Sequence, residues 1–252
     1  MRLHNVLLVD ITAKRIGLTV RDLKRQKMKV SIIIPFYGRW DLTHARMLEL
    51  YTHVQTECSI VLVDDASEGE EHIGGVAWWQ KKIDKHSVYY LRNTENLGFG
   101  WSMNRGAKVA LKHDAEILVF LSNDVRVFSD FVAEIVGLVE QDKNVLIGGE
   151  LLDRDTGWNV LDGTIIPYLT GWLLACHRDV WKELGGFDIK YGRHDYEDID
   201  LSLTASTKGY AFRVLSSRFH HMAGQTAPYD LARERITKEN QQKFIKKWRG
   251  KI

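Results

Sequence analysis

The chain has 252 residues, 27% of them charged, and a formal net charge of +2. This length allows one large α/β domain with a substantial core, and the near-neutral balance excludes a global electrostatic commitment to nucleic acid. The two cysteines, Cys58 and Cys176, fit no metal-ligand spacing and lie in apolar stretches, which disfavours a disulfide framework and favours a reducing compartment.

The first clear pattern begins at Lys29, and we treat residues 1–27 as an N-terminal appendage of unknown role. Two short β-branched runs, residues 29–39 and 59–67, end in turn residues. Between them, residues 42–54 have the periodicity of a helix. This order predicts a strand–helix–strand unit.

The same alternation continues through the first half of the chain. Further strands are predicted at residues 87–93, 116–124 and 145–151, and further helices at residues 100–113 and 130–142. Ser129 precedes the last of these helices, and we predict that it is the N-cap. Strands that alternate with helices form a mainly parallel sheet with helices on its faces. The pattern therefore predicts an α/β fold of the nucleotide-binding type.

The second half has a different character. Residues 157–192 are rich in tryptophan and glycine and indicate loops, one strand and a short helix at residues 178–186; loops of this kind build pockets. Regularity returns at residues 196–215, where acids suit a first helical turn, Gly209 suits the residue after the helix, and a strand follows. A basic helix is predicted at residues 236–250.

Carboxylates stand where predicted strands end. Asp64 and Asp65 follow one strand and Asp124 another. Each alone would most often cap a turn, but three acids at the same edge of a parallel sheet indicate a ligand. Two more groups lie farther along, an acidic cluster and a pair of histidines: Asp195, Glu197, Asp198, Asp200, His220 and His221. Carboxylate and imidazole are a usual ligand set for a divalent ion, completed here by substrate phosphates.

Five motifs, in this order, resemble the family 2 glycosyltransferases, whose fold is the GT-A fold: VSIIIPFYGR, VLVDDAS, NTENLGFGWSMNRG, LSNDV and GGFDIKYGRHDYEDIDLSL. The resemblance covers about residues 29–226. It implies a mainly parallel central sheet flanked by helices and an inverting transfer of a sugar. The donor would be a UDP-, GDP- or dTDP-linked sugar, and the acceptor a hydroxyl on a glycan, a lipid-linked saccharide or another molecule.

The resemblance also implies roles for single residues. Asp124 and His221 would bind a divalent cation, Mn²⁺ or Mg²⁺, and Asp198 would be the general base. Trp172 and Glu197 would lie near the sugar and the acceptor. The donor nucleotide would contact a larger set: Pro35, Tyr37, Asp65, Asn96, Gly98, Asn104 and Asn123.

The proposed chemistry is consistent with these residue types. A cation that bridges two phosphates neutralises the charge on the departing diphosphate, and Asp198 could take the proton of the attacking hydroxyl. Neighbouring residues on a helix point about 100° apart, so Glu197 and Asp198 cannot both face one atom. Core packing is an equal alternative for Trp172 and is the role we expect for Trp181.

Two other functions stay open. Ser122 stands where stricter members of the resembled family have the first acid of an Asp-x-Asp motif. This weakens the expected metal affinity and is the best argument for a binding module whose active site has decayed. The intact Asp124, Asp198 and His221 argue against such a module. A sugar nucleotidyltransferase would need a glycine- and arginine-rich loop after the first strand, where PFYGRW offers one of each. The sequence does not predict the oligomeric state.

We divide the chain into the appendage 1–27, a GT-A domain at residues 28–228 and a basic helical segment at residues 229–252. No run approaches the roughly 18 to 20 apolar residues of a membrane span, and no apolar signal region is present at the N-terminus, so we expect a cytoplasmic protein. In the last segment, Phe244, Ile245 and Trp248 stand among basic residues. This pattern suits a peripheral contact at the inner membrane surface, although such helices more often pack on their own domain.

Overall fold

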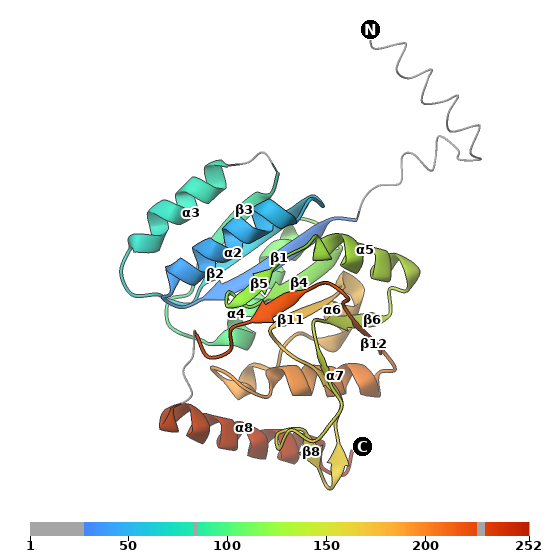
Figure 1. Cartoon of the computed structure of the whole chain (residues 1–252). Helices are drawn as coiled ribbons and strands as arrows, with labels where there is room; N and C mark the ends of the chain where they lie inside the picture. The colour runs from blue at the N-terminus through green and yellow to red at the C-terminus, as the bar shows by residue number, and fades with distance from the viewer. Residues whose placement is uncertain (1–27, 83–84, 226–229, 252) are drawn as a thin grey trace, which may run out of the picture.

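A seven-stranded sheet forms the centre of the part of the chain that the computed structural model describes, residues 28–82, 85–225 and 230–251. Its strands are β1 (Val30–Phe36), β2 (Cys58–Asp64), β3 (Ser87–Arg92), β4 (Ile117–Leu121), β6 (Val145–Gly148), β11 (Leu173–His177) and β12 (Ala211–Val214). They run in the order β12-β6-β11-β4-β1-β2-β3 (Figure 1). Only β11 is antiparallel to its neighbours, β4 and β6. The predicted appendage, residues 1–27, lies outside the described residues.

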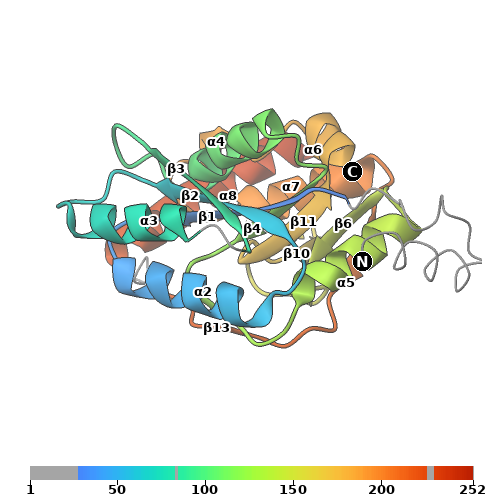
Figure 2. The same ribbon diagram turned by 90° about the horizontal axis from the view of Figure 1, so that it is seen from above.

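Helices cover both faces of the sheet. They are α2 (Trp40–His53), α3 (Glu71–Lys81), α4 (Phe99–Lys112), α5 (Phe131–Gln141), α6 (Arg178–Leu184), the 3₁₀-helix η2 (Ile189–Tyr191), α7 (Glu197–Thr207) and α8 (Leu231–Trp248). Figure 2 shows α2, α3 and α5 on one side of the sheet and α4 and α6 on the other. Successive side chains of β1 point to opposite faces of the sheet. Ile32 and Ile34 therefore pack in the core on the α2 side, and Ile33 packs in the core on the α4 side.

A third apolar cluster lies beneath α7 and contains α8 (Figure 1). It also includes residues of the short strands β7 (Leu151–Leu152), β8 (Val160–Leu161) and β10 (Tyr168–Leu169); β8 pairs with β9 (Thr164–Ile165). Phe244 and Trp248 of α8 are buried in this cluster against Tyr196 and Ile199. The apolar side of the predicted basic helix therefore packs on the rest of the described chain.

A separate pair of short strands lies over the sheet edge. β5 (Val125–Val127) pairs antiparallel with β13 (Phe219–His221), and the register sets His221 opposite Val125. His220 and His221 are the last two residues of β13, which is the last strand of the described chain. His221 therefore faces the segment that follows β4.

Two local predictions also need correction. Residues 71–81 form α3, which the sequence did not suggest because Gly74 and Gly75 weaken helical propensity. Gly75 has a packing reason, since a Cβ there would lie 2.5 Å from the indole of Trp40. The N-cap of α5 is Asp130, which accepts from Ala133 N at 3.2 Å, and it is not Ser129. The second oxygen of Asp130 also accepts the backbone N–H groups of the α2–β2 connection.

Other expectations are confirmed. Cys58 and Cys176 are both free and buried, and burial raises the pKa of each thiol to about 12. Trp181 belongs to the core on the α4 side, where its ring lies 4.4 Å from that of Phe120. Gly209 follows α7 with a φ of 82°, the left-handed conformation expected of a helix-ending glycine. Among the described residues, no helix has both the length and the apolar character needed to cross a membrane.

Candidate active site

The acids that end β2 are both buried and both bonded within the protein. Asp64 accepts hydrogen bonds from Ser67 N (2.7 Å) and Tyr90 Oη (3.0 Å), and its Oδ2 lies 2.9 Å from His72 Nε2. Asp65 accepts from Leu97 N (2.9 Å) and Gly98 N (2.7 Å). Asp64 thus shapes the turn after β2, and Asp65 fastens the loop before α4 to the carboxyl edge of the sheet.

Gly98 occupies a position that only glycine can fill. Its φ is +91°, and a Cβ there would lie 2.3 Å from the Cα of Arg193. Next to it, Phe99 N donates to Arg193 O at 3.0 Å. The loop that follows β3 is therefore in backbone contact with the turn that precedes α7, a connection that the sequence did not reveal.

Other residues expected at the nucleotide are at the same edge but differ in exposure. Asn104 pairs both ends of its amide with the backbone of Phe187, at 2.8 and 2.9 Å. Asn123 is buried and donates to Thr43 Oγ1 at 3.1 Å. Tyr37 is exposed, whereas Pro35 and Asn96 are half-buried. The side chains open to a ligand are thus those on the loops after β1 and β3.

Asp124 and His221 are brought together by the pairing of β5 with β13. His221 Nε2 lies 3.5 Å from Asp124 Oδ1, and Ser122 Oγ donates to the same oxygen at 2.6 Å. Burial alone would raise the pKa of Asp124, but the hydrogen bonds from His221 and Ser122 outweigh it, and the pKa lies below its usual value. The carboxylate is therefore charged at neutral pH.

Helix α2 holds the segment that carries Asp124, which the sequence analysis missed. Glu49 accepts from Val127 N (2.8 Å) and from Arg126 Nε (3.1 Å), and it also pairs with the buried Arg46. One turn earlier, Thr43 accepts the hydrogen bond from Asn123. Polar residues spaced three apart on the buried face of a helix were a visible signal of this role.

Asp198 lies in the first turn of α7. Its Oδ2 accepts from Gly171 N and its Oδ1 from Ile199 N, each at 2.8 Å. Burial raises the pKa of Asp198 to about 6, although these two backbone donors act in the opposite direction. The next residue after Gly171 is Trp172, whose ring stacks on His221 with centroids 5.7 Å apart. Trp172 thus links the Asp198 side of the site to the Asp124–His221 side.

Glu197 is more deeply enclosed than its neighbour. It is 8% exposed, and its Oε2 has no hydrogen-bond partner among the described residues. Burial raises the pKa of Glu197 well above its usual value, with a further contribution from the charge of Asp198. Burial therefore favours the neutral form of this carboxyl group.

The described residues offer part of a metal site. No group of three or more His, Cys, Asp or Glu side chains among them could hold an ion. Asp124 and His221 supply a carboxylate and an imidazole on adjoining strands, which suits a divalent cation whose other ligands are phosphate oxygens and water. These two side chains therefore fit a divalent cation that the protein and a substrate would bind together.

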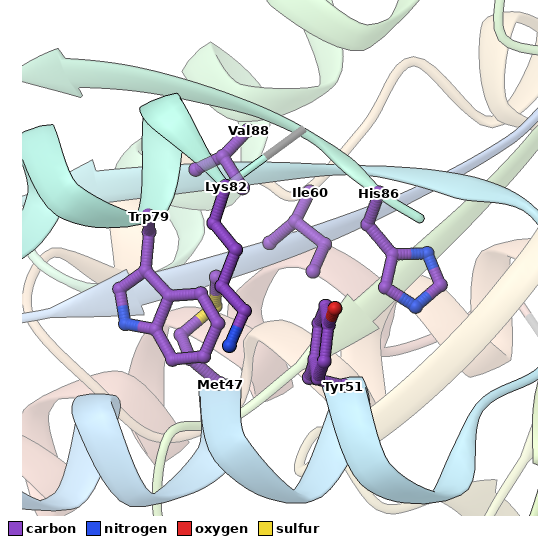
Figure 3. A pocket seen from close by; sticks show the side chains of 7 residues that line it. All are labelled: Met47, Tyr51, Ile60, Trp79, Lys82, His86 and Val88. Carbon is purple, nitrogen blue, oxygen red and sulfur yellow. The ribbon is translucent and has the colours of Figure 1, made fainter. Parts of the chain in front are cut away.

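Two hollows lie elsewhere in the described chain, and neither includes Asp124, His221 or Asp198. One cavity of about 10 Å³ lies between α2, α3 and the sheet, where Lys82 Nζ lies 4.2 Å from the ring centre of Tyr51 (Figure 3); it has room for one water at most. Another hollow, of about 270 Å³, lies beside α4 and α6 and includes Asn104, whose amide is already bonded.

A family model described as glycosyl transferase family 2 matches residues 31–187. Uncharacterized proteins of Mycobacterium bovis and Mycobacterium tuberculosis are each 24% identical to this chain over 217 residues, which is 79% of this chain and 76% of theirs.

Three solved structures share the fold. The mannosyltransferase PcManGT from Pyrobaculum calidifontis, in complex with GDP-Man and Mn²⁺, has a TM-score of 0.59 at 20% identity and is matched over 82% of this chain. GalNAc-T7 with UDP, GalNAc and Mn²⁺ has a TM-score of 0.67 at 17% identity and is matched over 90% of this chain. S. aureus TarS with UDP-GlcNAc has a TM-score of 0.55 at 15% identity and is matched over 81% of this chain. The chain covers 61%, 49% and 62% of these proteins, about half to three fifths of their length. At these identities the likeness is one of fold, and it confirms the GT-A architecture.

Proposed function

Since the chain belongs to glycosyl transferase family 2 and is a glycosyltransferase with the GT-A fold, we propose that it moves a sugar from a nucleoside diphosphate to an acceptor hydroxyl with inversion at the anomeric carbon. The observation that carries this proposal is the meeting of three groups around Trp172. Gly171, the residue before Trp172, donates a hydrogen bond to Asp198. The ring of Trp172 stacks on His221, and His221 in turn contacts Asp124.

Asp198 is the group that we assign as general base. Backbone donors fix both of its oxygens, yet each oxygen keeps a lone pair for a further proton. With a pKa of about 6 it is ionised at neutral pH and more basic than an ordinary aspartate. The acceptor hydroxyl gives its proton to this carboxylate, and its oxygen bonds to the anomeric carbon. The bond from that carbon to the diphosphate oxygen breaks, and the electron pair leaves with the diphosphate.

The donor nucleotide is assigned to the loops after β1 and β3. Tyr37 and Asn96 lie on these loops and Pro35 lies near the end of β1, each with part of its surface accessible. We propose that Asp65 and Gly98 act by shaping the same surface, because their polar atoms are bonded to each other. A direct contact between Asp65 and the base stays a prediction, as do the nucleotide contacts of Asn104 and Asn123, whose observed bonds are to Phe187 and Thr43.

Asp124 and His221 would hold the divalent cation, Mn²⁺ or Mg²⁺. Such an ion, when bound, neutralises the negative charge that develops on the leaving diphosphate. Two of the similar solved structures contain Mn²⁺ beside a nucleotide or nucleotide sugar, which supports this assignment. The charged state of Asp124 and the hydrogen bond from Ser122 prepare the carboxylate for a cation.

The acceptor side is assigned to Trp172 and Glu197. The half-buried Trp172 offers a ring face of the kind that packs on sugar C–H groups. Glu197 offers its Oε2, which has no hydrogen-bond partner among the described residues, as a polar contact. We propose that the acceptor is a glycan or a lipid-linked saccharide and that the protein acts in the cytoplasm, with a catalytic domain at residues 28–228. A membrane contact through α8 would depend on its lysines, because Phe244 and Trp248 are buried.

The first experiment is a calorimetric titration of the intact protein with UDP, GDP and dTDP, with and without Mn²⁺. We expect one nucleotide to bind in a metal-dependent way, and we expect Asp124→Ala to remove that dependence. The variant Lys238→Ala, on the exposed side of α8, is the matched control. Failure of all three nucleotides to bind would contradict the proposal.

One observation favours a second candidate, a nucleotide-sugar-binding module without turnover. Ser122 replaces an acid, and the described residues supply only the Asp124–His221 pair near the proposed cation. To separate the two, nucleoside diphosphate release is measured from whichever of GDP-mannose, UDP-GlcNAc or dTDP-glucose binds, with a panel of alkyl glycosides as acceptors. Binding without release across that panel would favour the module.

A further inference from the structure

Helix α8 begins 44 residues after the end of the family match at residue 187. It packs against the turn that leads into α7, the helix that carries Asp198. We propose that α8 is a positioning element of the active site, with Asn240 as the residue that sets the backbone from which Asp198 projects. This inference rests on the proposed role of Asp198 as the base. It gives α8 a part in turnover that its basic sequence does not suggest.

The turn before α7 has an unfavourable backbone. Asp195 and Tyr196, two consecutive residues with side chains, have φ values of +70° and +82°. Residues other than glycine rarely adopt this left-handed region, and two in a row persist only when surrounding contacts hold them there. Tyr196 is also the residue directly before α7, so its conformation fixes where Glu197 and Asp198 start.

Asn240 supplies the first set of those contacts. It is fully buried, and its Nδ2 donates to the backbone oxygens of Tyr191 (2.6 Å), His194 (2.8 Å) and Asp195 (3.1 Å). Its own oxygen accepts from Lys243 Nζ at 2.8 Å. The two N–H groups of this amide are thus shared among three carbonyl groups of the turn, and an apolar replacement would remove these donors.

A second set of contacts holds the side chain of Asp195. Its carboxylate accepts from Arg233 through two nitrogens, at 2.7 and 3.2 Å, and from Thr237 Oγ1 at 2.6 Å. Arg233, Thr237 and Asn240 lie on successive turns of α8 and so form one face of the helix. Charge-assisted bonds to a half-buried carboxylate are stronger than bonds between neutral groups. This face therefore holds both the backbone and the side chain of the turn.

The turn before α7 also contacts the loop between β3 and α4, which contains Gly98 and is called the donor loop below. Arg193 O accepts from Phe99 N, and Gly98 leaves no room between the two segments. The turn is thus enclosed between α8 and the loop that Asp65 holds. Because Asp65 anchors the donor loop independently of α8, loosening the turn from the α8 side should displace Asp198 more than it disturbs the nucleotide.

The test is Asn240→Ala in the full chain, with nucleoside diphosphate release measured from the nucleotide sugar that binds. We expect kcat to fall about 10- to 100-fold, since small displacements of a catalytic group cost rates of this order, while the Kd of the nucleoside diphosphate stays within about twofold. Val76→Ala, which removes buried methyl groups in the α2–α3 layer, is the matched control for a general loss of stability. It should leave kcat nearly unchanged at a temperature where both variants are folded.

Hydrogen exchange gives a readout that does not need turnover. The amide of Gly171 donates to Asp198, so its exchange should become faster in Asn240→Ala and stay slow in Val76→Ala. If Asn240→Ala does not fold, Thr237→Val, which removes the bond to Asp195 and keeps the side-chain size, should give the same changes to a smaller extent.

The outcomes separate the two proposals. Wild-type kcat and wild-type exchange at Gly171 in both α8 variants would overturn the positioning role. Full activity of Asp198→Asn, with faster exchange at Gly171 in Asn240→Ala, would overturn the assignment of the base and leave the contact between α8 and the turn established.

Discussion

The two sides of the site are held in different ways. On the donor side, Asp65 binds a loop that follows it by about thirty residues, and all of the elements involved are strands and helices of the central α/β layers. On the proposed acceptor side, Asp198 depends on Gly171 and on a turn that α8 holds from 38 to 49 residues away. A regular scaffold therefore places the loop that we assign to the nucleotide, whereas long-range side-chain contacts place the carboxylate that we propose as the base.

The largest effect is expected on the acceptor side. Asp198→Asn should lower transfer by about 10³-fold, because the amide cannot take the proton of the acceptor hydroxyl. Nucleotide binding should stay close to that of the wild type, since the donor loop is held by Asp65. The measurements are nucleoside diphosphate release and calorimetric binding.

Glu197→Gln is the comparison for that variant. Burial raises the pKa of Glu197 and so favours its neutral form, and glutamine is a neutral side chain of the same shape. We expect a smaller loss of rate than in Asp198→Asn. The reverse order of the two losses would show that the base had been assigned to the wrong carboxylate.

On the donor side, Gly98→Ala should be the most damaging change. The new Cβ would lie 2.3 Å from the Cα of Arg193, at a φ of +91°, so we expect the free energy of unfolding to fall by about 3 kcal/mol and nucleotide affinity to fall with it. Urea unfolding measures the first quantity and calorimetry the second.

Gly69→Ala is the matched control for Gly98→Ala. Its φ is +74°, but a Cβ there meets nothing within 4 Å, so only the backbone strain of about 1 kcal/mol applies. Equal losses in the two variants would mean that the contact with Arg193 contributes nothing.

The pH dependence should separate the two carboxylates. The raised pKa of Asp198, about 6, predicts that kcat rises from pH 5 to pH 7, because the base acts only when ionised. Asp124, with a lowered pKa, stays ionised throughout that range. A pH profile of kcat that is flat between pH 5 and pH 7, in a chain that remains folded, would argue against Asp198 as the titrating base.

Stability should change in the opposite direction over part of this range. The folded pKa of Asp198 lies above its usual value of 3.8, so the folded state binds more protons than the unfolded state between about pH 4 and pH 6. The contribution of this group to stability is therefore greatest below pH 4 and decreases as the pH rises towards 6. Urea unfolding of the wild type and of Asp198→Asn at several pH values isolates the contribution.

The smallest effect is expected at Ser122. Ser122→Ala removes one hydrogen bond to Asp124, worth about 1 kcal/mol, while His221 remains in contact. The metal-dependent affinity for the nucleotide should therefore change by no more than about fivefold. A complete loss of metal dependence would place Ser122 among the ligands themselves.

The strands of the donor side could be predicted because their signal is local. β1, β2 and β4 are β-branched or apolar runs with polar residues at or just after their ends, and burial on both faces accounts for their composition. α3 could not be predicted, because the packing of Trp40 on Gly75 is tertiary information. For the same reason the prediction of Ser129 as the cap was wrong, since the bonds from Gln55 and Thr56 to Asp130 are not visible in the sequence.

The sequence pointed to the acids of the candidate site, whose roles stay predictions, but not to the contacts that hold them. Asp124, His221 and Asp198 stand in recognisable motifs, but their proximity depends on β13, a strand of three residues that pairs with a segment about ninety residues earlier. The amide of Asn104 was expected at the nucleotide and is bonded to Phe187. Pairings between distant short segments have no periodicity from which to infer them.

The contact between Gly98 and Arg193 has a consequence for engineering. A chimera that imports residues 187–196 from a relative, in order to change the acceptor, would also replace the surface against which the donor loop rests. Such a graft should preserve donor use only when the loop around Gly98 and the facing residues of α8 come from the same parent. These three segments, distant in the sequence, are therefore best exchanged as a single module.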